Sequence, residues 1–356
     1  MAPAQSVRCL FSLLAMLSLL GLLLGACGAG DTGSTTTTIP RVNGFGGANN
    51  HGHSLLALPD NALVLATHYG LFRSGDGGAT WKLVAAGSGQ PMDGLMTTSM
   101  VSSALDRQRL YVLTQPAVAG AKGTLGLYTS ADAGQTWQLA IATKTTGNIY
   151  TVAAGNASAM EVYIYLPDLG PQGLKVSKDA GQHFSNTGTL PFARILGLFA
   201  IPGAPGQLLA YGNDGMARSS DGGVHWQVIA GVSGGVFGAT TLGPHQPIYA
   251  SGDSGIYASK DGGKTFTLVY TQSSYGSLIA SPVQPQLLYG KTGQAIYKST
   301  DGGHSWQALP TIKGNLQDLA PAPSSAALLY LSLSYPMEVY RFSQSDGKWS
   351  SLTPKA

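Results

Sequence analysis

The chain has 356 residues, of which 44% are hydrophobic and only 10% are charged, and its formal net charge is +3. Exposed helix faces usually carry Glu, Lys and Arg, and with only two glutamates and 49 glycines the composition excludes a mainly helical protein and suits short strands joined by tight turns. The small net charge and the lack of a basic cluster argue against nucleic acid as a partner.

The N-terminal segment is predicted to be a leader rather than part of the fold. The run CLFSLLAMLSLLGLLL, from Cys9 to Leu24, has the length and apolarity of a signal-peptide core. It ends in Leu24-Gly25-Ala26-Cys27, which resembles the bacterial lipobox. That resemblance implies that residues 1–26 are a lipoprotein signal peptide and that Cys27 is lipidated; a plain signal peptide or an uncleaved membrane anchor is the alternative.

A tether is expected to follow the leader. Residues 27–47 begin with Cys27 and continue with GAGDTGSTTTTIP, a polar and repetitive stretch that is typical of a flexible linker. No cysteine lies beyond Cys27, so the remaining domain cannot form an internal disulfide. A lipidated cysteine with more than one acyl chain anchors stably. We therefore expect a monomer outside the cytoplasm, held to a bacterial membrane by its lipid.

From residue 48 onward one short motif recurs along the chain. Its first copy is LFRSGDGGATW and its best later copies are IYASKDGGKTF and IYKSTDGGHSW. The motif aspartates are separated by 40 to 56 residues, which is the length of about four strands. These aspartates are Asp76, Asp132, Asp179, Asp221, Asp261, Asp301 and, in a degenerate seventh copy, Asp346.

Each unit contains four strand-like segments, here called A to D. In the first unit they are SLLAL (54–58), ALVLAT (62–67), GLFRS (70–74) and TWKLVA (80–85). Seven such units predict an all-β fold over residues 48–356, a seven-bladed β-propeller of four-stranded antiparallel blades, because separate sheets would leave faces and edges uncovered. The last unit ends in its own strand D, so a swapped closing strand would have to come from RVNGF (41–45). The sequence leaves that choice open.

The repeated pattern S-x-D-x-G-x-[TS]-[WF] resembles the Asp-box, or BNR repeat. Sialidases, sortilin-type receptors, photosystem II assembly factor propellers and bacterial glycosyl-hydrolase-like lipoproteins carry such boxes. The resemblance covers the whole domain and implies a propeller of the sialidase-like superfamily with a box in each C–D hairpin. It implies no single function, since these families use one scaffold differently.

The residues of the motif suit a hairpin turn. An Asp carboxylate accepts backbone N–H groups across its own turn, serine does so more weakly, and glycine permits positive φ. The aromatic residue that opens strand D is expected to pack between neighbouring blades. Calcium needs more oxygen ligands than one aspartate supplies, so we predict a structural role for the boxes, and neither a metal nor a cofactor.

The repeat also separates two faces of the propeller. A–B and C–D turns share one face, and B–C turns and D–A connections share the other, where propellers generally bind ligands around the mouth of the channel. True sialidases need three arginines about a carboxylate. Here Arg73 and Arg218 occupy strand C positions, Arg107 and Arg109 fall in an A–B turn, and that triad is missing.

Candidate binding residues remain at the channel mouth. His51 and His53 begin the first strand A, and alternate residues of a strand point the same way, so they could share one ligand or metal. His68 ends strand B of the same blade. Bonding of these histidines to backbone or water is the favoured interpretation. The other candidates are Asp93 in the first D–A loop, Arg194 and Glu338.

No pair of carboxylates stands out as catalytic. Glycoside hydrolysis needs two facing carboxyl groups, and the turns of this face supply only scattered ones. Asp214 and Asp253 are more simply turn residues, and Asp318 is placed on an inner strand. We therefore assign no catalytic residue and favour a non-enzymatic binding module for a protein or glycan. The alternative is a glycoside hydrolase-like enzyme with its site at the channel mouth.

Overall fold

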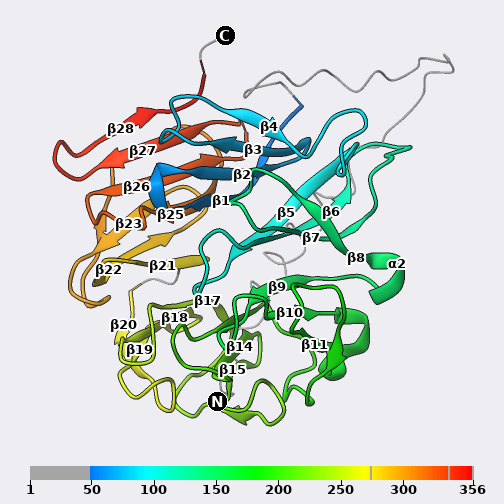
Figure 1. Cartoon of the computed structure of the whole chain (residues 1–356). Helices are drawn as coiled ribbons and strands as arrows, with labels where there is room; N and C mark the ends of the chain where they lie inside the picture. The colour runs from blue at the N-terminus through cyan, green and yellow to red at the C-terminus, as the bar shows by residue number, and fades with distance from the viewer. Residues whose placement is uncertain (1–48, 273–274, 336, 355–356) are drawn as a thin grey trace, which may run out of the picture. The chain divides into compact units, whose positions relative to one another are not determined.

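The computed structural model describes residues 49–272, 275–335 and 337–354. These residues form seven separate four-stranded antiparallel sheets, and in each sheet the four strands follow one another in the chain (Figure 1). The predicted all-β, seven-bladed propeller is thus confirmed. The leader, Cys27 and the tether of residues 27–47 lie outside the described residues.

The first four blades have the following strands. Blade 1 contains β1 (Gly52–Ala57), β2 (Leu63–Thr67), β3 (Gly70–Ser74) and β4 (Lys82–Val84). Blade 2 contains β5 (Leu95–Ser102), β6 (Leu110–Pro116), β7 (Gly126–Ser130) and β8 (Gln138–Ala142). Blade 3 contains β9 (Thr151–Ala154), β10 (Val162–Tyr165), β11 (Leu174–Ser177) and β12 (Ser185–Asn186). Blade 4 contains β13 (Gly197–Ala200), β14 (Leu208–Gly212), β15 (Gly215–Ser219) and β16 (Gln227–Val228).

The last three blades repeat the pattern. Blade 5 contains β17 (Val236–Thr241), β18 (Ile248–Gly252), β19 (Gly255–Ser259) and β20 (Thr267–Tyr270). Blade 6 contains β21 (Ser277–Ser281), β22 (Gln284–Lys291), β23 (Ile296–Ser299) and β24 (Gln307–Ala308). Blade 7 contains β25 (Leu316–Pro321), β26 (Leu328–Leu333), β27 (Val339–Ser343) and β28 (Lys348–Ser351).

Helical segments are short and lie between strands. In the described part of the chain they are the 3₁₀ helices η2 (Pro59–Asn61) and η3 (Pro167–Gln172) and the single-turn α2 (Thr143–Thr146). Within residues 49–272, 275–335 and 337–354 no helix is long and apolar enough to cross a membrane.

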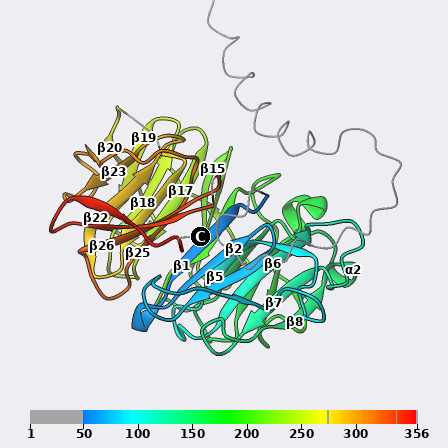
Figure 2. The same ribbon diagram turned by 90° about the horizontal axis from the view of Figure 1, so that it is seen from above.

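The ring closes where blade 7 meets blade 1. Strand β1 packs against β5 on one side and β25 on the other, and Figures 1 and 2 show the blue first blade between the cyan and the orange-red ones. No strand is exchanged between these two sheets in the described part of the chain, because each sheet uses only consecutive strands. RVNGF (41–45) lies outside the described residues.

The hydrophobic core is divided among the joints between neighbouring blades. Middle strands such as β2 and β18 are buried along their whole length, because blades cover both of their faces. Seven hydrophobic clusters result, and each is shared by two adjacent blades. The recurring aromatic residue of each unit packs in the cluster shared with the preceding blade, as predicted: Trp81, Trp137, Phe184, Trp226, Phe266, Trp306 and Trp349.

One predicted boundary needs correction. We expected strand D of blade 1 to begin at Thr80, but β4 begins at Lys82. The Thr80 backbone N–H and hydroxyl both donate to Asp76, so this residue still belongs to the turn. The outer strands are consequently short.

Candidate functional site

The aspartates of the repeated motif form closed turns. Asp76 Oδ1 accepts the Ser74 hydroxyl at 2.7 Å and the Thr80 N–H at 2.9 Å, while Asp76 Oδ2 accepts the Thr80 hydroxyl at 2.6 Å. The Thr80 bonds, followed by that of Ser74, lower the pKa of Asp76 to about 2. Gly77 and Gly78 in this turn have positive φ. These carboxylates are used within their own hairpins.

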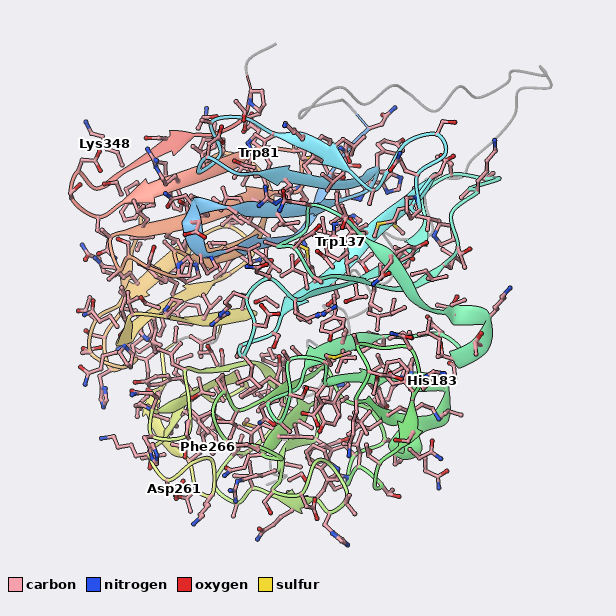
Figure 3. The ribbon with its side chains drawn as sticks, in the orientation of Figure 1. Trp81, Trp137, His183, Asp261, Phe266 and Lys348 are labelled. Atoms are coloured by element: carbon pink, nitrogen blue, oxygen red, sulfur yellow. The ribbon has the colours of Figure 1, made fainter. Side chains whose placement is uncertain are left out.

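The same bonds recur in the other five well-preserved copies, with a partner that sequence reasoning missed. The side chain four residues after each aspartate bonds its second carboxylate oxygen, and this residue is Thr, Ser or His. His183 Nδ1 lies 2.6 Å from Asp179 Oδ2, and His225 makes the same pair with Asp221. The regular spacing in the sequence could have predicted it. Asp346, in the seventh copy, is exposed (Figure 3 shows its neighbour Lys348 at the outer edge).

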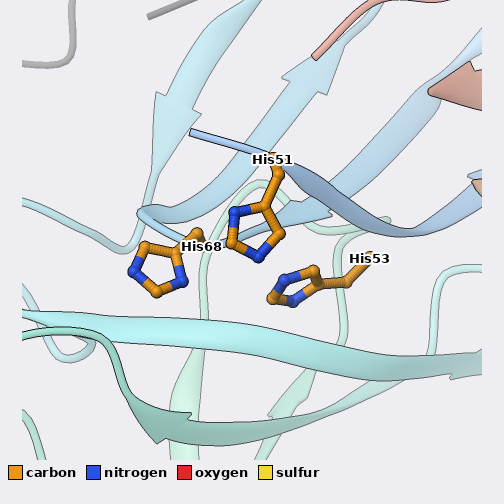
Figure 4. Close-up of side chains that lie close together, drawn as sticks. All are labelled: His51, His53 and His68. Atoms are coloured by element: carbon orange, nitrogen blue, oxygen red, sulfur yellow. The ribbon is translucent and has the colours of Figure 1, made fainter. Parts of the chain in front are cut away.

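Three histidines of blade 1 converge on the opposite face, which carries the B–C turns and D–A connections and is called the mouth face below. One potential ligand atom from each of His51, His53 and His68 lies within 4.8 Å of the others (Figure 4). The His51 ring centroid is 4.7 Å from that of His53 and 4.7 Å from that of His68. His51 immediately precedes β1, His53 is in it, and His68 directly follows β2. The backbone N–H of His68 donates to His51 O at 2.9 Å, so one hairpin of blade 1 positions all three.

Hydrogen bonds hold two of these rings. His53 Nδ1 lies 2.6 Å from Thr97 O, at the start of the inner strand of blade 2. His51 Nδ1 lies 2.9 Å from the hydroxyl of Tyr335, whose ring stacks on His51 at 5.0 Å. Tyr335 belongs to the B–C turn of blade 7, so the group joins side chains from both ends of the ring. Sequence reasoning missed Thr97 and Tyr335, because only the closed ring places them beside blade 1.

All three imidazoles are held toward their neutral form. Burial, followed by the nearby His53 and His68, lowers the pKa of His51 to about 4. Burial also lowers the pKa of His53, although the backbone of Thr97 opposes this shift. It lowers the pKa of His68 as well, against an opposing effect of the Ala117 backbone. His68 Nδ1 is buried and makes no hydrogen bond of ordinary geometry. The group therefore presents lone pairs rather than positive charge at neutral pH.

The predicted carboxylates do not join the histidines. Among the described residues no Asp or Glu belongs to this group of mutually close ligand atoms. Asp93 is buried in the β4–β5 loop, where its Oδ2 accepts Gly89 N–H and its Oδ1 has no hydrogen-bond partner. Glu338 accepts the Tyr340 hydroxyl at 2.7 Å. Arg194 is exposed between blades 3 and 4, away from the first blade.

The inner-strand carboxylate of Asp318 serves the closure of the ring. Its Oδ2 accepts the backbone N–H of Leu55 at 2.9 Å and the Ser54 hydroxyl at 3.2 Å, which links β25 to β1. Burial raises the pKa of Asp318, although these bonds and the charge of Lys291 oppose the rise. Asp253 Oδ2 likewise accepts the backbone N–H of Gly235 and so fixes the loop before β17. Neither group is free to act with a second carboxylate.

The mouth face also exposes aromatic surface. Tyr150 and Tyr335 are 50% and 47% exposed, and Leu169 and Leu196 lie exposed on the same face. The exposed apolar side chains of the other face are aliphatic and stand singly in turns of different blades: Leu105, Met160, Val224 and Val283. Isolated aliphatic residues are ordinary surface features, whereas exposed tyrosines are typical of binding surfaces.

Comparison with known proteins yields structural likenesses only. No protein-family model matches the sequence, and no curated protein matches it. An ancestral GH74 enzyme superposes with a TM-score of 0.63 at 15% identity, over 88% of this chain and 47% of that one, so this chain spans about half the length of that enzyme. YCF48 from Cyanidioschyzon merolae has a TM-score of 0.59 at 14% identity, with 84% and 97% of the two chains covered.

Two further propellers of similar structure are a peptide complex and a component of a secretion system. A structure of YCF48 bound to a D1 peptide has a TM-score of 0.56 at 14% identity, over 80% of this chain and 90% of that one. PorZ, an essential surface component of the type-IX secretion system of Porphyromonas gingivalis, has a TM-score of 0.59 at 13% identity, over 88% and 39%. At these identities the likeness shows the fold, and the fold's neighbours include both enzymes and binding proteins.

Proposed function

We propose that this chain is a non-enzymatic binding module that holds a protein partner through the mouth face of its propeller. One observation carries the proposal. The exposed Tyr335 stacks on the group of three histidines, and no carboxylate of the described residues belongs to that group. Hydrolysis of a glycoside needs two facing carboxyl groups. An aromatic surface with nearby polar groups instead suits recognition of a peptide or a glycan, and a similar propeller bound to a peptide supports the first choice.

The proposal includes the repeat family and a location. The six closed serine–aspartate turns support membership of the Asp-box repeat propellers, and the lipobox-like Leu24-Gly25-Ala26-Cys27 supports lipidation of Cys27 and an extracytoplasmic, membrane-tethered protein. Radiolabelled palmitate should enter the wild-type chain and not Cys27→Ala. Label retained by that variant would refute the lipidation.

Binding is tested on the full chain in detergent, with peptide and glycan arrays as probes. We expect one class of probe to bind the wild type, and Tyr335→Ala and Tyr150→Ala to weaken that binding at least tenfold. Leu105→Ala and Val283→Ala on the opposite face are matched controls and should bind as the wild type does. Equal loss in the control pair would place the site elsewhere.

Catalysis is tested in parallel with chromogenic glycosides. We expect no turnover above the rate of a blank. Turnover that disappears in Asp93→Asn or Glu338→Gln would replace the binding module by the glycoside hydrolase-like alternative.

A further inference from the structure

We propose that His51, His53 and His68 form a binding site for a divalent transition-metal ion, with Zn²⁺ as the best-fitting metal and one coordination position left open. This site shares Tyr335 and the histidine group with the proposed binding face, but metal binding can be measured whether or not a partner binds there. It goes beyond the favoured sequence interpretation, in which the histidines bond to backbone or water. The three side chains offer ligand atoms within 4.8 Å of one another.

The spacing is close to what zinc requires. Zinc–imidazole bonds are about 2.0–2.1 Å long, so nitrogens that share a tetrahedral ion lie about 3.4 Å apart. To bind an ion, the rings would have to move closer together than the present 4.8 Å limit, and rotation about the side-chain torsions is the movement that would bring them there. The anchors are stiff, because His51 O accepts the His68 N–H and both sides of the hairpin belong to one sheet. A facial set of three ligands is thus positioned before any metal binds.

The hydrogen bonds around the rings select the ligand nitrogens. Thr97 O is a pure acceptor, so His53 carries its proton on Nδ1 and presents the Nε2 lone pair. The Tyr335 hydroxyl can accept from His51 Nδ1–H, and metal binding requires that tautomer, in which His51 also presents its Nε2 lone pair. Histidines that ligate metals usually donate their other N–H to an oxygen in this way.

The donor set decides the class of metal. Three imidazoles without a carboxylate or thiolate suit Zn²⁺, Cu²⁺ and Ni²⁺, whereas Mg²⁺ and Ca²⁺ require oxygen ligands. Three protein ligands leave the fourth tetrahedral position for water or for a donor of a bound molecule. His51 and His68 are only half-buried and Tyr335 is exposed, so that position is accessible from the mouth face.

The test measures Zn²⁺ binding by titration calorimetry on the full chain in detergent. Cys9→Ser and Cys27→Ser are present in every variant, so that no thiol contributes. We expect one Zn²⁺ per chain, and at least tenfold weaker binding in His53→Ala and in His68→Ala. Co²⁺ should give the intense visible bands of a tetrahedral site. Thermal melting establishes whether each variant is folded. If His53→Ala does not fold, the Zn²⁺ affinity of His68→Ala tests the proposal.

Controls separate this site from other imidazoles. His225 pairs with Asp221, as His183 does with Asp179, and both are competing surface sites; His245 is exposed in an A–B turn. His225→Ala and His245→Ala should retain wild-type affinity. The proposal is overturned if the wild type binds no Zn²⁺ in the micromolar range, or if wild-type affinity survives in folded His53→Ala or in folded His68→Ala.

Discussion

The indole Nε1 of Trp81 donates a hydrogen bond of 3.0 Å to the carbonyl oxygen of Leu352, which lies 271 residues later in the chain. Both side chains also pack in the cluster shared by blades 1 and 7. The two ends of the described domain are thus joined by side-chain packing and by hydrogen bonds such as this one, without a common sheet.

This relationship predicts that Trp81→Phe loosens the last blade. The variant keeps an aromatic ring but loses the hydrogen bond to Leu352, at a cost of about 1 kcal/mol in the free energy of unfolding. Hydrogen exchange followed by mass spectrometry should show faster exchange in β27 and β28. Trp306→Phe is the control, since its indole bonds Gly303 in its own turn. Unchanged exchange in residues 339–351 of Trp81→Phe would contradict the closure role.

The turns of the repeated motif predict a stability loss without a binding loss. Asp261 accepts bonds from Ser259, Lys264 and Thr265, and Asp261→Ala removes all of them. We expect about 1–3 kcal/mol less stability to denaturant, because these are bonds to a charged acceptor. Asp346→Ala, in the exposed seventh turn, should change stability little. Probe binding that fails in folded Asp261→Ala would show that the box holds a ligand after all.

Acid should destabilise the propeller below pH 4 through the same carboxylates. The pKa of Asp76 is about 2 in the fold against a usual 3.8, and the pKa of Asp179 and of Asp261 is lowered as well. Such groups add stability above their unfolded pKa, and that contribution disappears as the pH falls through the folded value. The buried Asp318, whose pKa is raised, contributes with the opposite sign.

The measurement is the melting temperature between pH 4 and pH 2. His51, with a pKa of about 4, titrates at the upper end of this window, so the wild type is compared with Asp76→Asn, which has the same histidines. We expect a fall toward pH 2 in the wild type and a shallower fall in Asp76→Asn. An equally steep curve for that variant would show that Asp76 does not couple protonation to folding.

The fold could be predicted from the sequence because its information is local and repeated. Every well-preserved unit repeats one serine, one aspartate, a glycine and an aromatic residue. The first three form the turn, and the aromatic residue packs between neighbouring blades. Strand limits were less accurate, since Thr80 satisfies Asp76 instead of the sheet ladder. Chain closure could not be predicted, because the Trp81–Leu352 contact depends on the curvature summed over seven blades.

The candidate site was only half predictable. The two-residue spacing of His51 and His53 placed them together, and counting strands brought His68 to the same end of the blade. Tyr335 and Thr97 come from neighbouring blades, and no local pattern marks them as partners. The topology places Asp93, Glu338 and Arg194 on the mouth face, but their side chains do not join the histidine group. A position in the sequence does not give the distance between two side chains.

Asn156→Ala should destabilise the joint between blades 3 and 4. This buried amide donates to the carbonyl oxygens of Ile201, Ala204 and Gln207 at 2.7–2.9 Å, so it ties blade 3 to the A–B turn of blade 4. Its Oδ1 also accepts the Gly206 N–H. Each of these carbonyls also accepts a backbone N–H within the turn, so removal of the amide leaves the Gly206 N–H without its acceptor and breaks the link between the blades, at a cost of about 1–3 kcal/mol.

Denaturant unfolding of Asn156→Ala measures this loss, with Asn186→Ala as the matched control. Asn186 contacts only Lys175 at the exposed outer strand, so its truncation should be nearly neutral. Glu161 accepts the backbone N–H groups of Asn156 and Ala157. Glu161→Ala should therefore lose nearly as much stability as Asn156→Ala, and the loss in the double variant should be smaller than the sum of the two single losses. Full additivity would mean that the two residues stabilise this corner independently.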